Sequence, residues 1–103
     1  MTDPDAAGSR LIRKLEQSAE IAGCTMDVVS WRSRDVTCSI FACAQHRLTV
    51  SVGGSSSRAW LETLDEHSVY VPGYVLAELA VGTIEPCGEQ LLVELEAQTV
   101  KEA

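Results

Sequence analysis

The first clear pattern in the chain is helical. Leu11, Leu15 and Ala19 recur at a spacing of about 3.6 residues between charged and polar positions, which is typical of an amphipathic helix. Ser9 is a suitable N-cap and Gly23 a suitable C-terminal stop, so the pattern predicts a helix over residues 10–22. Residues 1–8 are polar and are expected to form a disordered tail, which leaves residues 9–103 as a single domain.

The pattern then changes to a period of two, which is typical of strands. Alternation predicts three strands, over residues 26–31, 36–44 and 47–52. Polar residues at 32–35 and 45–46 favour two short turns between them. Short turns between three strands predict an antiparallel meander.

Glycine and serine at 53–57 break the sheet pattern, and a second, shorter helix is expected over residues 58–66. Its buried side would carry Trp60 together with Leu61 and Leu64. Residues 74–81 fit both a helix and a strand. A strand is preferred because a turn at 85–88 and an alternating strand over 90–100 follow, and together they make a hairpin.

These elements predict an α+β domain of order αβββαββ. Its five-stranded, mostly antiparallel sheet would carry both helices on one face. A sheet of this kind has edge strands with unpaired backbone groups. The edge over residues 25–32 is guarded only by Asp27, so a homodimer is expected.

Charge is distributed unevenly along the chain. Residues 1–58 carry seven basic and six acidic groups, whereas residues 59–103 carry nine acidic groups and only Lys101, for a total of −7. An acidic chain repels phosphate backbones, so nucleic-acid binding is not expected. No apolar stretch approaches the roughly 20 residues of a membrane span, and the N-terminus lacks the basic region of an export signal. The sequence therefore predicts a cytoplasmic protein that does not bind membranes.

The cysteines and histidines do not form a recognisable site. Cys24, Cys38, Cys43 and Cys87 contain no closely spaced pair of the kind that binds zinc, and in this compartment buried thiols without disulfides are expected. No metal and no cofactor is predicted.

Two short clusters have the residue types of catalytic sites. Cys43 and His46 lie near one predicted turn and have the residue types of a thiol–imidazole pair. Asp65, Glu66 and His67 end the second helix. Packing and a solvated helix end are the simpler interpretations of these two clusters, so no catalytic residue is predicted.

Three arginines and two serines are candidates for contact with an anion or a partner. Arg32, Arg34 and Arg47 are expected to meet at one end of the meander, where they would bind an anion or a carboxylate. Ser55 and Ser56 belong to a Gly–Ser run that precedes a helix, but the run lacks the lysine of a true phosphate loop. The simpler interpretations are solvated turn charges and a flexible connection.

Three glutamates are candidates for an acidic partner surface. Glu94 and Glu96 project from the outward side of the last strand, and Glu78 lies on the strand expected beside it. These residues either face water or form a stripe that meets a partner.

Two resemblances complete the picture. Residues 46–50, 74–81 and 95–100 resemble segments of short bacterial proteins of unknown function. The expected order αβββαββ resembles the topology of class I type III secretion chaperones, which implies a dimer that wraps an unfolded segment of a partner.

The leading hypothesis is therefore a protein-interaction or adaptor domain, chaperone-like and without enzymatic activity. The alternative is a domain that binds a small ligand or an anion.

Overall fold

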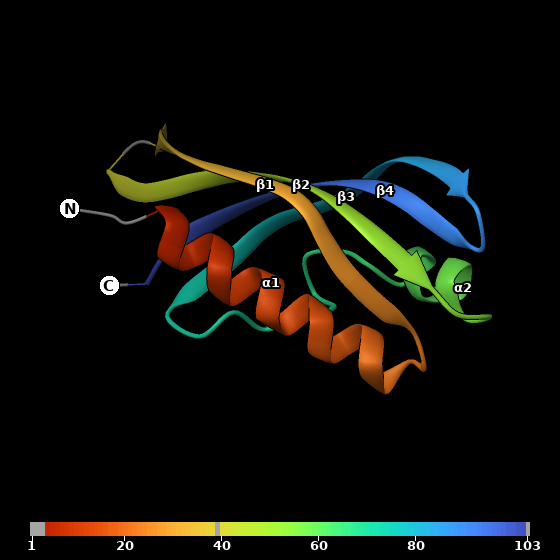
Figure 1. The fold of residues 1–103 in the computed structure, drawn as a ribbon. Coiled ribbons are helices and arrows are strands. Elements are labelled where there is room, and N and C mark those ends of the chain that lie inside the picture. The colour runs from red at the N-terminus through yellow and green to blue at the C-terminus, as the bar shows by residue number, and fades with distance from the viewer. Residues whose placement is uncertain (1–3, 39, 103) are drawn as a thin grey trace.

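The computed structural model describes residues 4–38 and 40–102, which form two helices and a four-stranded antiparallel sheet (Figure 1). The elements in chain order are α1 (Pro4–Ile21), β1 (Thr25–Cys38), β2 (Phe41–Gly53), α2 (Ser57–Glu62), β3 (Tyr74–Cys87) and β4 (Gln90–Lys101). The strands lie in the order β1-β2-β4-β3, and every neighbouring pair is antiparallel. The predicted α+β class with an antiparallel sheet is confirmed. The order of the described elements is αββαββ, with four strands in place of the predicted five.

The missing strand results from two predicted turns that do not exist. Residues 32–35 continue β1, and residues 45–46 lie within β2. Arg32, Ser33 and Arg34 pair in unbroken register with residues 47, 46 and 45 of β2, so the polar segment keeps its ladder hydrogen bonds. The expected three-stranded meander is therefore a hairpin of two long strands.

Helix α1 covers one face of the sheet. Ala7, Leu11, Leu15 and Ala19 have no exposed surface, and their spacing of four residues places them on one side of the helix. They pack against the strand residues of the main core, which include Leu48 and Leu95. Burial of a leucine side chain contributes roughly 1.5–3 kcal/mol, so this row is the main attachment of α1.

The helix begins at Pro4, earlier than the prediction of residue 10. Residues 4–8 form its first turns, and residues 1–3 lie outside the described part of the chain. Proline suits the first helical position because the missing N–H group would have no partner there, and Asp5 interacts favourably with the helix dipole.

Helix α2 is shorter than predicted and lies on the same side of the sheet as α1 (Figure 1). Trp60 and Leu61 are buried as expected, whereas the helix ends at Glu62 and not at residue 66. The Trp60 Nε1 donates a hydrogen bond of 3.0 Å to Ser18 Oγ, which joins α2 to α1.

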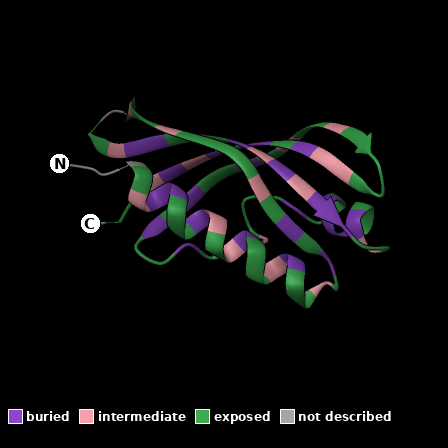
Figure 2. Ribbon diagram, in the orientation of Figure 1, coloured by how far each residue is buried: buried purple, intermediate pink, exposed green. Residues whose placement is uncertain are grey.

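The ambiguous residues 74–81 belong to strand β3, as preferred. β3 and β4 are joined by the two-residue turn Gly88–Glu89, in which Gly88 has φ of +63°. β4 lies between β2 and β3, so the last strand is internal and the edges of the sheet are β1 and β3. Figure 2 shows buried and exposed residues alternating along these strands, because one face of the sheet meets the helices and the other does not.

Neither helix of the described chain has both the length and the apolar character that a membrane crossing requires.

Candidate functional site

The candidate site lies on the sheet face opposite α1, which we call the open face. No described element covers this face. It carries charged and polar side chains in its middle and apolar side chains at one end, which is the end reached by β1 as it approaches Cys38. The residues that define it are Ser30, Arg32, Arg34, Val36, Phe41, Cys43, Gln45, Arg47, Thr49, Val75, Glu78, Ala80, Glu94, Glu96, Gln98 and Val100.

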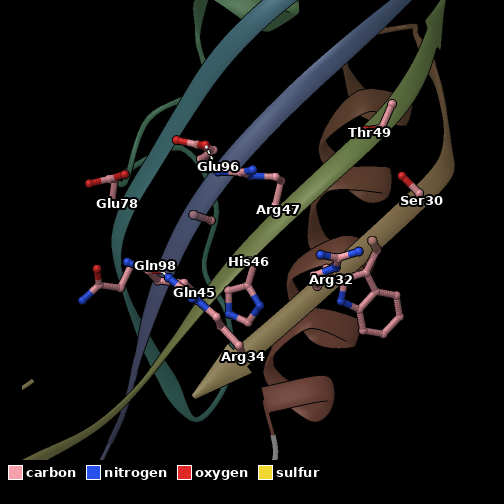
Figure 3. Close-up of a pocket in the computed structure, with 12 residues that line it drawn as sticks. Ser30, Arg32, Arg34, Gln45, His46, Arg47, Thr49, Glu78, Glu96 and Gln98 are labelled. Atoms are coloured by element: carbon pink, nitrogen blue, oxygen red, sulfur yellow. Dashed lines mark hydrogen bonds and ion pairs between the residues drawn. The ribbon is translucent and has the colours of Figure 1, made fainter. Parts of the chain in front are cut away.

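The three predicted arginines do come together on the open face. Arg32 and Arg34 project from β1, and Arg47 projects from β2 directly opposite Arg32 (Figure 3). The Arg34 Nη2 donates a hydrogen bond of 2.9 Å to Gln45 Oε1. Within residues 4–38 and 40–102, neither Arg32 nor Arg34 has a carboxylate at ion-pair distance.

The predicted acidic residues lie on the other half of the same face. Glu94 and Glu96 come from β4. Glu78 comes from β3, beyond Glu96 in the view of Figure 3. Arg47 Nη2 lies 3.0 Å from Glu96 Oε1, which joins the two halves. Both side chains are more than half exposed, so the ion pair contributes at most about 1 kcal/mol. The arginines and the glutamates, predicted as two separate candidate sites, therefore share one surface.

The middle of the open face is hollowed. A depression of about 710 Å³ spans all four strands, with Arg34 and Gln45 on one side and Glu78 and Glu96 on the other. Its two sides carry opposite charge, so it can accommodate a surface or a molecule that bears both signs.

Ser55 and Ser56 do not belong to this site. They follow Gly53, which pairs with Thr25 at the other end of β2, eight residues from Gln45 and thus about 26 Å away along the strand. Ser56 makes no side-chain capping hydrogen bond, and the Ser57 hydroxyl donates instead to Gly54 O at 2.6 Å. The following helix has six residues, so we assign no anion site to this loop.

The possible Cys43–His46 pair does not form. Three residues apart on a regular strand, the two side chains point to opposite faces of the sheet. Cys43 lies on the open face, and His46 lies on the face covered by α1.

The cluster of Asp65, Glu66 and His67 forms an exposed turn. The His67 backbone N–H donates to Asp65 Oδ1 at 2.8 Å, and His67 Nε2 lies 3.5 Å from Glu66 Oε1. No three His, Cys, Asp or Glu side chains gather as a metal site would in the part of the chain that the structure describes.

The thiol prediction is correct for two cysteines and wrong for one. Cys24 and Cys43 are buried thiols, as expected. Cys87 is free but exposed, because it lies at the end of the edge strand β3. The side chain of Cys38 lies outside the described residues.

A chain of hydrogen bonds that no sequence pattern predicted runs beneath α1, from the partly exposed Trp31 to the buried Thr99. The Trp31 Nε1 donates to Ser33 Oγ at 2.8 Å, Ser33 Oγ lies 2.6 Å from His46 Nδ1, and His46 Nε2 lies 2.8 Å from Thr99 Oγ1. His46 and Thr99 are almost fully buried, so the chain ties β1, β2 and β4 together from inside. The alternation of Leu48, Val50 and Val52, continued two residues back, would have placed His46 on this buried side.

Ser33 and His46 resemble a nucleophile with its base, but His46 is only 2% exposed and Ser33 lies against α1. Gly8 of α1 packs against Ser33 and Trp31, and a Cβ at position 8 would lie 2.5 Å from Ser33 Oγ and 2.8 Å from Trp31 Nε1. We therefore interpret the chain of hydrogen bonds as structural.

Burial gives His46 a pH-dependent effect on stability. Desolvation lowers the pKa of His46 below its usual 6.5, whereas the unfolded chain keeps the usual value. As the pH falls through 6.5, the unfolded state binds a proton that the folded state does not, so stability is lost. The slope from one such proton is at most about 1.4 kcal/mol per pH unit.

We expect the urea concentration at the unfolding midpoint of the wild-type protein to decrease when the pH is lowered from 7.5 to 5.5. The variant His46→Gln should show a flatter dependence, whatever its absolute stability. His67→Gln, which changes an exposed histidine, is the matched control and should keep the wild-type slope. A His46→Gln slope equal to that of the wild type would contradict the assignment of the proton to His46.

The chain matches no protein-family model, no curated protein and no solved structure.

Proposed function

We propose that this chain is a protein-interaction or adaptor domain and that its interaction surface is the open face. The observation that supports the proposal is the composition of this uncovered face. Phe41 and Val75 are 58% and 54% exposed at its apolar end, and Ile40 at the adjoining strand junction is 90% exposed. Apolar side chains beside arginines and glutamates form the mixture of contacts that protein interfaces use.

The charges of the face support binding to a protein in preference to a nucleic acid. Three arginines on β1 and β2 lie beside three glutamates on β3 and β4. A phosphate backbone would be attracted by one half and repelled by the other, whereas a protein surface can present both signs. The chaperone-like form of the proposal adds that paired chains hold an extended partner segment.

Site-specific photo-crosslinking in cells tests this proposal. A photoreactive amino acid at Phe41 or Arg34 should give adducts heavier than the chain, because these positions would contact the partner. Glu16 and Glu20, which are exposed on the outer side of α1, are the control positions and should give far fewer adducts. Equal yields from the helix and the open face, or no adduct from the face, would contradict the proposal.

The depression favours a second candidate, a domain that binds a small anionic ligand. Arg32 and Arg34 line it without a carboxylate partner among the described residues, so their guanidinium groups are available to an anion. Saturable NMR shifts of these two residues on addition of inorganic phosphate would favour this candidate.

A further inference from the structure

The charges of the open face are divided along a line parallel to the strands. In the middle of the face, arginines lie on β1 and β2 and glutamates lie on β4 and β3 (Figure 3). Nearer the β3–β4 turn, Asp27 of β1 and Glu85 of β3 share a row with Ser51 and Leu92, so the division holds for the middle of the face only. Two copies of such a surface are complementary when a two-fold rotation about that line relates them, because the arginine half of each copy then faces the glutamate half of the other. The line runs between β2 and β4, in the centre of the sheet.

The register of the strands makes this complementarity specific. A first row across β1, β2, β4 and β3 consists of Arg34, Gln45, Gln98 and Glu78. The two-fold rotation about the central line places Arg34 of one copy opposite Glu78 of the other, and Glu78 of the first opposite Arg34 of the second. The two glutamines meet each other in the middle, where their amides can exchange hydrogen bonds.

The row beside it follows the same rule. It consists of Arg32, Arg47, Glu96 and Ala80. The half-turn places Arg47 opposite Glu96 of the second copy, so the exposed ion pair within each chain becomes part of a four-membered network. It places Arg32 opposite the small Ala80, so no like charges meet in this row. In the row of Asp27 and Glu85 the half-turn would set two carboxylates opposite each other, so the contact ends before that row.

The apolar end of the face also matches itself. The next row consists of Val36, Cys43, Val100 and Val75. After the half-turn Val36 lies opposite Val75 of the second copy. Cys43 is only 1% exposed and adds no contact surface of its own. Val75 is now 54% exposed, and this contact would remove its apolar surface from water.

The size of the face is adequate for a stable contact. Four strands about 4.8 Å apart and about ten residues long, at about 3.3 Å per residue, cover roughly 600 Å² in projection. A standard interface buries about 800 Å² of accessible surface on each partner, and side chains raise accessible area above the projected area.

We infer that the open face binds a second copy of this chain, with the two sheets packed face to face about a two-fold axis between β2 and β4. The inference rests on the proposed interaction function and names the partner. Two-fold symmetry makes every contact occur twice, as in most homodimers. The two sheets would lie about 10 Å apart, with strand directions crossed by about 30° because of their twist.

A charge swap tests the geometry. Light scattering at micromolar to several hundred micromolar concentration should return about twice the 11.1 kDa mass of the wild-type chain. Arg34→Glu alone and Glu78→Arg alone should each weaken the dimer at least tenfold, because each places like charges opposite one another at two symmetric contacts. The double variant should recover to within about threefold of wild type.

A change in dimer affinity in these charge-reversal variants reflects contacts between the two copies and not contacts within one chain. Arg34 and Glu78 of the same chain are separated by three strand spacings, about 14 Å, so they exchange little energy directly. The matched control is Arg13→Glu, which makes the same charge change on an exposed position of α1 and should leave the dimer unchanged. Circular dichroism melts verify that each variant is folded.

Two results would overturn the inference. One is a wild-type monomer that persists at several hundred micromolar. The other is a dimer whose affinity ignores the single substitutions, or falls further in the double variant, since the contact would then lie elsewhere. If the open face still crosslinks to heavier proteins in cells while the pure protein is monomeric, the inference that it binds a second copy is wrong. The proposed interaction function then stands. A dimer in vitro without open-face crosslinks in cells would support the pairing and overturn the proposed function.

Discussion

Trp60→Ala is expected to destabilise the fold by about 3–5 kcal/mol, as truncations of large buried aromatic residues do. Only 3% of Trp60 is exposed, and its indole belongs to the core cluster that joins α1, α2 and the sheet. The substitution also leaves Ser18 Oγ without the hydrogen bond from Trp60 Nε1. Because α2 is only six residues long, it has little stability without this anchor.

Thermal unfolding followed by circular dichroism measures the effect. A domain of about 100 residues loses about 4–8 °C in Tm for each kcal/mol, so the melting temperature should fall by more than 10 °C. Trp60→Phe is the matched variant, because it keeps an aromatic ring and removes the N–H donor. Its melting temperature should decrease less than that of Trp60→Ala. A Trp60→Ala protein that melts within one or two degrees of wild type would show that the indole does not anchor α2.

Leu15→Ala is expected to cost about 2–5 kcal/mol, because it removes buried volume where α1 meets the sheet. Leu15 has no exposed surface and lies in the middle of the row formed by Ala7, Leu11 and Ala19. Alanine has the highest helix propensity, so the loss cannot come from the helix itself and reports on packing.

Ile21→Ala is the control for this measurement. Ile21 lies on the same helix but is 88% exposed, so its truncation removes little buried surface. Urea unfolding of both variants should show a large decrease in midpoint for Leu15→Ala and a change within about 0.5 kcal/mol for Ile21→Ala. Equal effects of the two substitutions would contradict the assignment of the Leu15 side of α1 to the core.

Local patterns predicted the strongly periodic elements because burial on one side determines both pattern and structure. The row of Leu11, Leu15 and Ala19 identified α1, and the alternation through Leu48, Val50 and Val52 identified β2. The turn at 85–88 and the alternating strand after it favoured a hairpin, and residues 74–81 were therefore correctly assigned to a strand, β3. Boundaries were less accurate, as for α1, which begins at Pro4.

Polar stretches were misread as turns because composition alone does not show what lies beside them. Ser33 looked like a turn residue, yet it faces inward and meets His46. Arg32 and Arg34 face outward on a strand whose backbone is paired residue by residue with β2. A polar strand survives when a long partner strand supplies its backbone hydrogen bonds, and that partner was itself divided by the false turn at 45–46.

The sequence by itself determined the α+β class, the antiparallel hairpin of β3 and β4 and the buried side of α1. It also supplied two sets of candidate site residues, the arginines Arg32, Arg34 and Arg47 and the glutamates Glu78, Glu94 and Glu96. Tertiary structure alone decided that these six charges share one face. β4 enters the sheet between β2 and β3, so Glu96 comes to lie 3.0 Å from Arg47, a residue 49 positions earlier. Periodicity reports the side of a strand that is buried, because that depends on neighbours one or two residues away. The order of strands depends on how long-range pairing closes the core, and no local pattern contains that information.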